Sequence, residues 1–322
     1  MRPVWLPLTL LLSGLLWSAS VEGRRRPRLG EALEHVPRIA QPVVRAVLTA
    51  KRQVLLSWRR ARAGTDGDRL FQAVLADVEA RVRLGQRCVM VWDIDNTLVD
   101  TRYRTQAAAR TFAAQWQGKR PPELERLASV KIRDVGRDAA ETCRNLGIVD
   151  PIVVERFGAL WERFFWYGEN LHYDRRIGKT ADMAWAAWWA GAENRYLTGR
   201  VETLPDGSEG LRLPTLRQLV QQGLPDARSD HLFLKPRYDG YRTPEYKTGQ
   251  LFDWVKEGLH VASFTTDGTR DISYAQAHGP RLDYFRYAFP LDGEPHPLRP
   301  GTPVIPHKRR LSGPVAGATI RP

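Results

Sequence analysis

The chain has 322 residues, 43% of them hydrophobic and 26% charged, which is enough apolar material for a buried core and excludes a wholly disordered chain. Its net charge of +13 belongs mainly to the flanks, because residues 24–62 carry 11 Lys or Arg against 2 acids and residues 290–322 carry 5 against 2. We therefore expect no specific nucleic-acid binding. Two cysteines without Cys-x-x-Cys or His-Glu-x-x-His spacing also argue against a zinc site.

The N-terminus has the pattern of an export signal. Met1 and Arg2 precede a mainly apolar stretch from Val4 to Trp17, and small residues follow at positions 18–20. Because this stretch is short for a membrane span, we predict that residues 1–23 are a secretory signal peptide and that the protein is exported, either periplasmic or secreted. An uncleaved membrane anchor is the alternative, since one positive charge is a weak start for a signal peptide.

Two basic flanks enclose the rest of the chain. Residues 24–68 are interpreted as a basic N-terminal arm, with an amphipathic helix expected between Ile39 and Trp58. Residues 290–322 are rich in proline and contain a basic run at 307–310, which predicts an irregular tail. Such flanks either remain solvated or make weak, salt-sensitive contacts with polyanions or membrane surfaces.

Apolar runs and helical patterns alternate in the middle of the chain. The apolar runs occupy residues 88–92, 195–197, 231–234 and 261–264. Helical spacings of apolar residues occur over 70–82, 213–222 and 246–257. Continuous apolar runs are typical of buried parallel strands, and their alternation with helices predicts a doubly wound, Rossmann-like α/β sheet. We assign residues 69–100 and 186–289 to this core.

About a hundred residues separate the first two predicted strands, far more than one crossover requires. Residues 101–185 are therefore predicted to be an inserted cap, mainly α-helical because apolar residues recur at helical spacing. Aromatic residues crowd together over 161–173, beside several arginines. The spacing favours a packed core for the cap, and a surface that holds a nucleobase or aryl leaving group is the alternative.

Two acids that are two residues apart stand at the end of the first predicted strand, in Asp93-Ile94-Asp95. In an open α/β sheet, ligands bind at the carboxyl ends of the strands, and side chains two residues apart on a strand point the same way. Asp93 could attack a phosphorus atom, while Asp95 gives a proton to the departing alcohol and later takes one from water. Acids that merely cap the following helix are the structural alternative.

The segment Asp93-Ile94-Asp95-Asn96-Thr97-Leu98 resembles the first motif of the haloacid-dehalogenase superfamily, and three further matches follow in order. The matches are Thr198-Gly199-Arg200, Lys247 and the turn Asp267-Gly268-Thr269-Arg270-Asp271. The resemblance implies phosphate binding by Thr198, Gly199, Arg200 and Lys247. It also implies a Mg²⁺ ion held by acids from the set Asp93, Asp95, Asp267 and Asp271.

Within that superfamily, the chain looks most similar to the exported acid phosphatases, through the Trp92–Asp100 pattern, the Leu-Thr-Gly-Arg motif and residues 267–279. The implied function is Mg²⁺-dependent hydrolysis of a small phosphomonoester through an aspartyl-phosphate on Asp93. Two features depart from that pattern: Thr266 stands where those enzymes usually have glycine, and residues 204–210 look like an added turn. Because glycine permits the tightest turns, Thr266 leaves open how tight the metal-binding loop is in this chain.

Several alternatives stay open on the sequence. Lys235 competes with Lys247 for the phosphate-binding role because it also follows an apolar run. Arg200 either contacts substrate or only pairs with an acid. A hydrolase of the same superfamily acting on a non-phosphate substrate, such as a carbon–halogen bond, is a second enzyme function. A non-catalytic envelope protein that binds anionic polymers is the alternative from another class.

Overall fold

The computed structural model describes residues 66–119, 121–204, 206–237, 242–280 and 285–287. The predicted signal peptide, the helix expected over 39–58, the Pro-rich tail and nearly all of the basic arm lie outside these residues. No helix within the described ranges combines the length and the apolar character that a membrane crossing would need.

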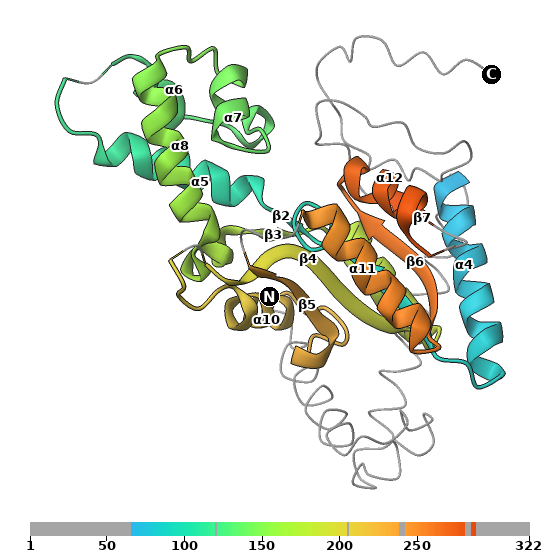
Figure 1. The fold of residues 1–322 in the computed structure, drawn as a ribbon. Coiled ribbons are helices and arrows are strands. Elements are labelled where there is room, and N and C mark those ends of the chain that lie inside the picture. The colour runs from blue at the N-terminus through green and yellow to red at the C-terminus, as the bar shows by residue number, and fades with distance from the viewer. Residues whose placement is uncertain (1–65, 120, 205, 238–241, 281–284, 288–322) are drawn as a thin grey trace, which may run out of the picture. The chain divides into compact units, whose positions relative to one another are not determined.

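A parallel sheet of five strands forms the centre of the described fold (Figure 1). β1 (Cys88–Trp92) lies between β4 (Glu193–Thr203) and β6 (His260–Thr266). β5 (Leu232–Arg237) extends the sheet beyond β4, and β7 (Phe285–Tyr287) extends it beyond β6. The predicted α/β class and the four predicted strands are confirmed. β7 was not predicted, because three residues with an arginine in the middle make no apolar run.

Helices cover both faces of this sheet. All five residues of β1 are buried, as expected for a central parallel strand. Val89 and Val91 pack with apolar residues of α11 (Thr243–Lys256) and α12 (Thr269–His278). α4 (Asp66–Arg83) and α9 (Gly178–Trp189) also contact β1 and contact each other. Because neighbouring residues of a strand face opposite sides, these two helix pairs enclose the strand between them.

The helical insertion lies between two short antiparallel strands, β2 (Val99–Asp100) and β3 (Arg175–Arg176). Its elements are α5 (Arg102–Gln115), α6 (Glu123–Ala128), η1 (Ile132–Asp134), α7 (Ala139–Asn145), α8 (Pro151–Trp166) and η2 (Gly168–Tyr173). The predicted helical character is confirmed. α9 overlaps the predicted segment 101–185 but contacts β1 and β4, and the limits of the domains stay predictions.

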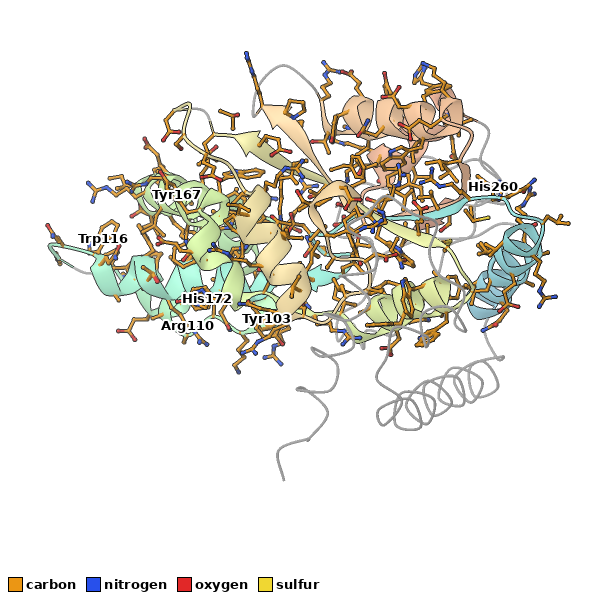
Figure 2. The ribbon with its side chains drawn as sticks, turned by 90° about the horizontal axis from the view of Figure 1, so that it is seen from below. Tyr103, Arg110, Trp116, Tyr167, His172 and His260 are labelled. Atoms are coloured by element: carbon orange, nitrogen blue, oxygen red, sulfur yellow. The ribbon has the colours of Figure 1, made fainter. Side chains whose placement is uncertain are left out.

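The insertion has a hydrophobic core of its own, built mainly from α5, α6, α7 and α8. Trp161 and Phe164 pack against this core, and Trp161 stacks on Phe165 with ring centroids 4.7 Å apart. The packed-core interpretation therefore holds for Trp161 and Phe164. Figure 2 shows the side chains of Tyr103 and Arg110 on α5 and of Trp116 just after its end, with Tyr167 and His172 in the same part of the fold and His260 well apart from them.

The remaining helix, α10 (Arg212–Gln221), follows a hairpin that extends β4 and contacts both β5 and η2. The backbone N–H of Gly210 donates to the Glu202 carbonyl (2.7 Å) where the chain doubles back. α10 therefore joins the edge of the sheet to the end of the insertion. This contact brings polar side chains of α10 close to the carboxyl end of β1.

Candidate active site

Three adjacent strands place polar side chains at one edge of the sheet. Asp93 directly follows β1, Thr198 lies on β4, and Thr266 is the last residue of β6. The strands are parallel, so these positions share the carboxyl edge, with β1 in the middle. The backbone N–H of Asp93 also donates to the Thr265 carbonyl at 2.8 Å, which ties the start of the loop to β6.

The loop after β1 turns sharply at Asn96, whose φ of 56° lies in the left-handed region that asparagine tolerates better than most residues. The Asn96 N–H donates to the Val99 carbonyl (2.7 Å), and its side-chain oxygen accepts from the Thr101 hydroxyl (2.8 Å). The chain therefore curls back into β2 and the insertion. This local turn holds Asp93 and Asp95 at the carboxyl edge of the sheet.

Asp93 belongs to a compact buried cluster. Lys247 Nζ donates to Asp93 Oδ2 at 2.6 Å and to Asp271 Oδ2 at 2.5 Å. The Thr266 hydroxyl lies 2.9 Å and 3.1 Å from the same two oxygens. The other oxygen of Asp93, Oδ1, accepts from the Ile94 N–H at 2.8 Å. The structure thus brings three predicted site residues, Asp93, Lys247 and Asp271, into direct contact.

Burial and neighbouring charges shift the pKa values of Asp93 and Lys247 in this cluster. The pKa of Asp93 is raised, mainly by burial and further by the neighbouring Asp271 charge. The positive charge of Lys247 opposes that rise. Burial would lower the pKa of Lys247, but the Asp271 and Asp93 carboxylates outweigh it and raise that pKa above its ordinary value, so the ammonium stays charged. The two acids therefore share a single positive partner, the Lys247 ammonium.

This donor set fits a hard cation such as Mg²⁺. Magnesium is usually held by one or two carboxylates, with waters and substrate oxygens completing its shell. Asp93 and Asp271 supply side-chain carboxyl oxygens of the kind that Mg²⁺ prefers. Over the ranges that the structure describes, no three Asp, Glu, His or Cys side chains are grouped for metal binding. The full predicted set, with Asp95 and Asp267, therefore stays a prediction.

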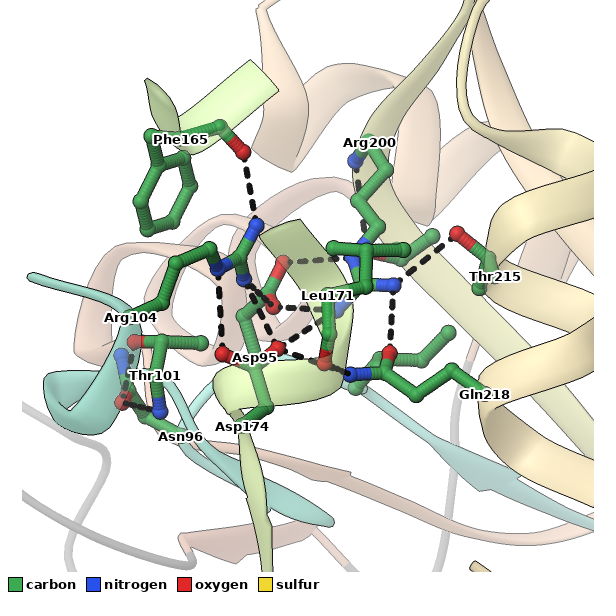
Figure 3. A network of polar contacts seen from close by, with 12 residues as sticks. Asp95, Asn96, Thr101, Arg104, Phe165, Leu171, Asp174, Arg200, Thr215 and Gln218 are labelled. Atoms are coloured by element: carbon green, nitrogen blue, oxygen red, sulfur yellow. Dashed lines mark hydrogen bonds and ion pairs between the residues drawn. The ribbon is translucent and has the colours of Figure 1, made fainter. Parts of the chain in front are cut away.

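The Asp95 carboxylate is directed to a second cluster (Figure 3). Arg200 binds it with two hydrogen bonds, Nε to Oδ2 at 3.1 Å and an Nη atom to Oδ1 at 2.7 Å. Arg104 of the insertion adds a third to Oδ1, also at 3.1 Å. Burial would raise the pKa of Asp95, but the Arg200 and Arg104 charges outweigh it and lower the pKa to about 2. Asp95 is therefore ionised at neutral pH in this arrangement.

The same network joins the insertion to the sheet. Arg104 binds both carboxylate oxygens of Asp174 at 3.0 Å, and its guanidinium also donates to the Phe165 carbonyl (2.7 Å). Gln218 of α10 donates to Asp174 Oδ2 and accepts from Arg200, both at 2.8 Å. Sequence reasoning missed Arg104, Asp174 and Gln218, because no local pattern marks residues that meet only in the folded chain.

The predicted phosphate-binding motif lies on β4, where the pairing with β5 shifts register between Thr198 and Val201. Thr198 is buried, and its hydroxyl accepts from the Arg200 N–H at 3.2 Å. A Cβ on Gly199 would lie 3.0 Å from the Thr243 methyl carbon, so the glycine lets the start of α11 approach β4 closely. Arg200 pairs with an acid, Asp95, which is one of the two predicted roles. Lys247 reaches Asp93, which favours it over Lys235.

No protein-family model and no curated protein matches this chain. Solved structures do. One from Clostridium difficile, proposed to be a phosphatase, is 11% identical and covers 63% of this chain and 85% of its own, with a TM-score of 0.41. A haloacid dehalogenase-like family hydrolase from Streptococcus pneumoniae is 11% identical, covers 62% and 84%, and has a TM-score of 0.38. A HAD family hydrolase from Deinococcus radiodurans, with bound phosphate and sodium, is 18% identical, covers 66% and 84%, and has a TM-score of 0.36. Such distant matches assign neither family nor activity.

Proposed function

We propose that this protein is a Mg²⁺-dependent phosphomonoester hydrolase that acts through an aspartyl-phosphate on Asp93. The observation that carries the proposal is the cluster at the end of the central strand, in which Lys247 bridges Asp93 and Asp271 at 2.6 Å and 2.5 Å. A buried carboxylate at a ligand-binding strand end, next to a fixed positive charge, suits attack on a phosphate ester.

The reaction would proceed in two displacements. A carboxylate oxygen of Asp93 attacks phosphorus, and the bond from phosphorus to the alcohol oxygen breaks with its electron pair on that oxygen. Water then gives a proton to the Asp95 carboxylate and attacks phosphorus, the bond between phosphorus and the Asp93 oxygen breaks, and phosphate is released with the Asp93 carboxylate restored. Lys247 offsets the negative charge on the phosphoryl group in both steps. Bound Mg²⁺ would supply further charge neutralisation, with Asp93 and Asp271 as its protein ligands.

Asp95 limits which substrates react in this arrangement. A departing alkoxide needs a proton, and a carboxylate with a pKa of about 2 holds none at neutral pH. Asp95 can act as the proton donor only when Arg200 and Arg104 loosen their hold on it. We therefore expect p-nitrophenyl phosphate, whose phenolate departs without a proton, to be hydrolysed faster than a simple alkyl phosphate.

Replacing Asp93 with asparagine tests the mechanism. The amide has the same shape but is a much poorer nucleophile, so kcat on p-nitrophenyl phosphate with Mg²⁺ should fall by at least about a thousandfold. Asp253→Asn is the matched control, because Asp253 lies on the exposed surface of α11, the helix that carries Lys247. Asp93 is not the nucleophile if its variant keeps more than about a tenth of the wild-type kcat, a loss below ~1.4 kcal/mol.

The engagement of Asp95 also favours a second candidate, hydrolysis of a carbon–halogen bond. A halide ion leaves without a proton, so a permanently ionised Asp95 would not hinder this reaction. A small 2-haloacid and p-nitrophenyl phosphate, assayed side by side for halide and phosphate release, separate the two activities. Halide release alone would replace the phosphatase proposal. Release of neither would leave the non-catalytic polymer-binding function as the remaining proposal.

Export belongs to the same proposal. It is supported by the apolar segment from Val4 to Trp17 and the small residues that follow it. N-terminal sequencing of the protein recovered from its native cells would find a start near residue 24 if the signal is cleaved. An intact Met1 would instead support the uncleaved anchor. Weak binding of the basic flanks to anionic vesicles, if present, should fall steeply with added salt.

A further inference from the structure

Thr266 stands at a position where a hydroxyl can act directly on the proposed nucleophile. Its side chain is 0% exposed at the end of β6. Its Oγ1 lies 2.9 Å from Asp93 Oδ2 and 3.1 Å from Asp271 Oδ2. The Gly268 N–H donates to this oxygen at 3.1 Å. The hydroxyl therefore contacts both acids of the cluster and the turn that follows β6.

The proton of this hydroxyl is directed to the carboxylates. A threonine hydroxyl has one hydrogen and two lone pairs, and an N–H bond such as that from Gly268 uses one of the lone pairs. The Thr266 hydroxyl is the donor toward the two carboxylate oxygens, and its single hydrogen serves one of them at a time. Bonds of this kind, to a charged acceptor in a buried place, are stronger than bonds between neutral groups.

We propose that Thr266 is a positioning residue that fixes the orientation of the Asp93 carboxylate for attack; the inference rests on the proposed function. Three donors hold this carboxylate: Lys247 and Thr266 on Oδ2, and the Ile94 N–H on Oδ1. Lys247 also holds Asp271 through Oδ2, and the same Asp271 oxygen is the alternative acceptor for the single Thr266 hydroxyl hydrogen. Without the hydroxyl, Oδ2 keeps Lys247 alone, and the carboxylate can rotate away from the attack geometry.

A pair of variants separates positioning from packing. Thr266→Val keeps the shape and removes the hydroxyl, whereas Thr266→Ser keeps the hydroxyl and removes the methyl group. With p-nitrophenyl phosphate and Mg²⁺, Thr266→Val should lower kcat about 10- to 100-fold, the range for one hydrogen bond to a charged group, with KM changed less than about twofold. Thr266→Ser should keep kcat within about threefold of wild type, because it restores the donor.

Thr265→Val is the matched control. Thr265 precedes Thr266 on the same strand and is equally buried, but its hydroxyl has no hydrogen-bond partner among the residues that the structure describes. Its kcat should stay within about twofold of wild type. Circular dichroism of all three variants should match wild type. A folded Thr266→Val with wild-type kcat, or a folded Thr266→Ser that fails to restore kcat, overturns the proposal.

Crystal structures provide a readout that does not depend on activity. Asp93 should occupy more than one orientation, or a rotated one, in Thr266→Val, and the wild-type orientation in Thr266→Ser. An unchanged Asp93 in Thr266→Val overturns the positioning role. If the wild-type protein hydrolyses no phosphomonoester, the proposed function fails, and the crystal structures still decide whether Thr266 holds Asp93.

Discussion

Replacing Arg104 with methionine removes a positive charge and four hydrogen bonds from the network between the insertion and the sheet. Arg104 and Asp174 have side-chain exposures of 1% and 0%, and without Arg104 the buried Asp174 carboxylate keeps one cationic partner among the described residues, Arg200 at 3.5 Å. Removing one partner of such a buried pair costs about 3–5 kcal/mol, because the remaining charge stays buried. In a domain of this size, that loss lowers Tm by roughly 6–20 °C.

Thermal and urea unfolding of Arg104→Met measure this cost directly. Arg176→Met is the control, because Arg176 lies on β3 and pairs with Asp182 at 3.2 Å with side chains 37% and 49% exposed. Exposed pairs of this kind contribute less than about 1 kcal/mol. The double variant Arg104→Met/Asp174→Leu should recover much of the stability, since it removes the buried carboxylate that, in the described part of the chain, only Arg200, at 3.5 Å, would still pair with. If Arg104→Met costs no more than Arg176→Met, the network does not stabilise the junction and the reasoning is refuted.

Burial is the largest cause that lowers the pKa of His231 from 6.5 to about 4. Between these pH values the unfolded chain binds a proton at His231 that the folded chain does not. The free energy of unfolding should therefore fall by on the order of 3 kcal/mol as pH drops from 6.5 to 4. Urea unfolding at pH 7 and pH 4.5 should show this loss in wild type and a smaller one in His231→Gln. Excess EDTA should abolish phosphate release and Mg²⁺ restore it, while Asp271→Asn should raise the Mg²⁺ concentration required; undiminished turnover in EDTA would rule out the metal. A Cβ at Gly210 would lie 2.2 Å from the Val201 carbonyl oxygen, whereas one at Gly249 meets no atom within 4 Å. Gly210→Ala should therefore destabilise by about 1–3 kcal/mol and Gly249→Ala stabilise by up to ~1 kcal/mol, as compared by thermal unfolding.

Local patterns in the sequence were enough to predict the layers of the fold. Continuous apolar runs predicted the four longer strands, since a strand buried on both faces has no polar alternation to disguise it. The acids after the first run and the helix that carries Lys247 were found in the same way. A candidate ligand-binding edge follows from these positions, because the carboxyl ends of parallel strands meet at one side of the sheet. β7 was missed because its short run is not apolar throughout.

Only the tertiary structure decided what each acid contacts. Asp95 and Arg200 are separated by 105 residues, and Arg104 and Asp174 by 70, so no local spacing relates them. The sequence singled out Thr266 as a departure from the expected glycine, but only the packing of β6 beside β1 places its hydroxyl on Asp93. Periodicity and turn chemistry act over a few residues and can be recognised in sequence. Pairing between buried charges depends on how whole strands and helices pack against one another. This packing is determined only in the folded chain.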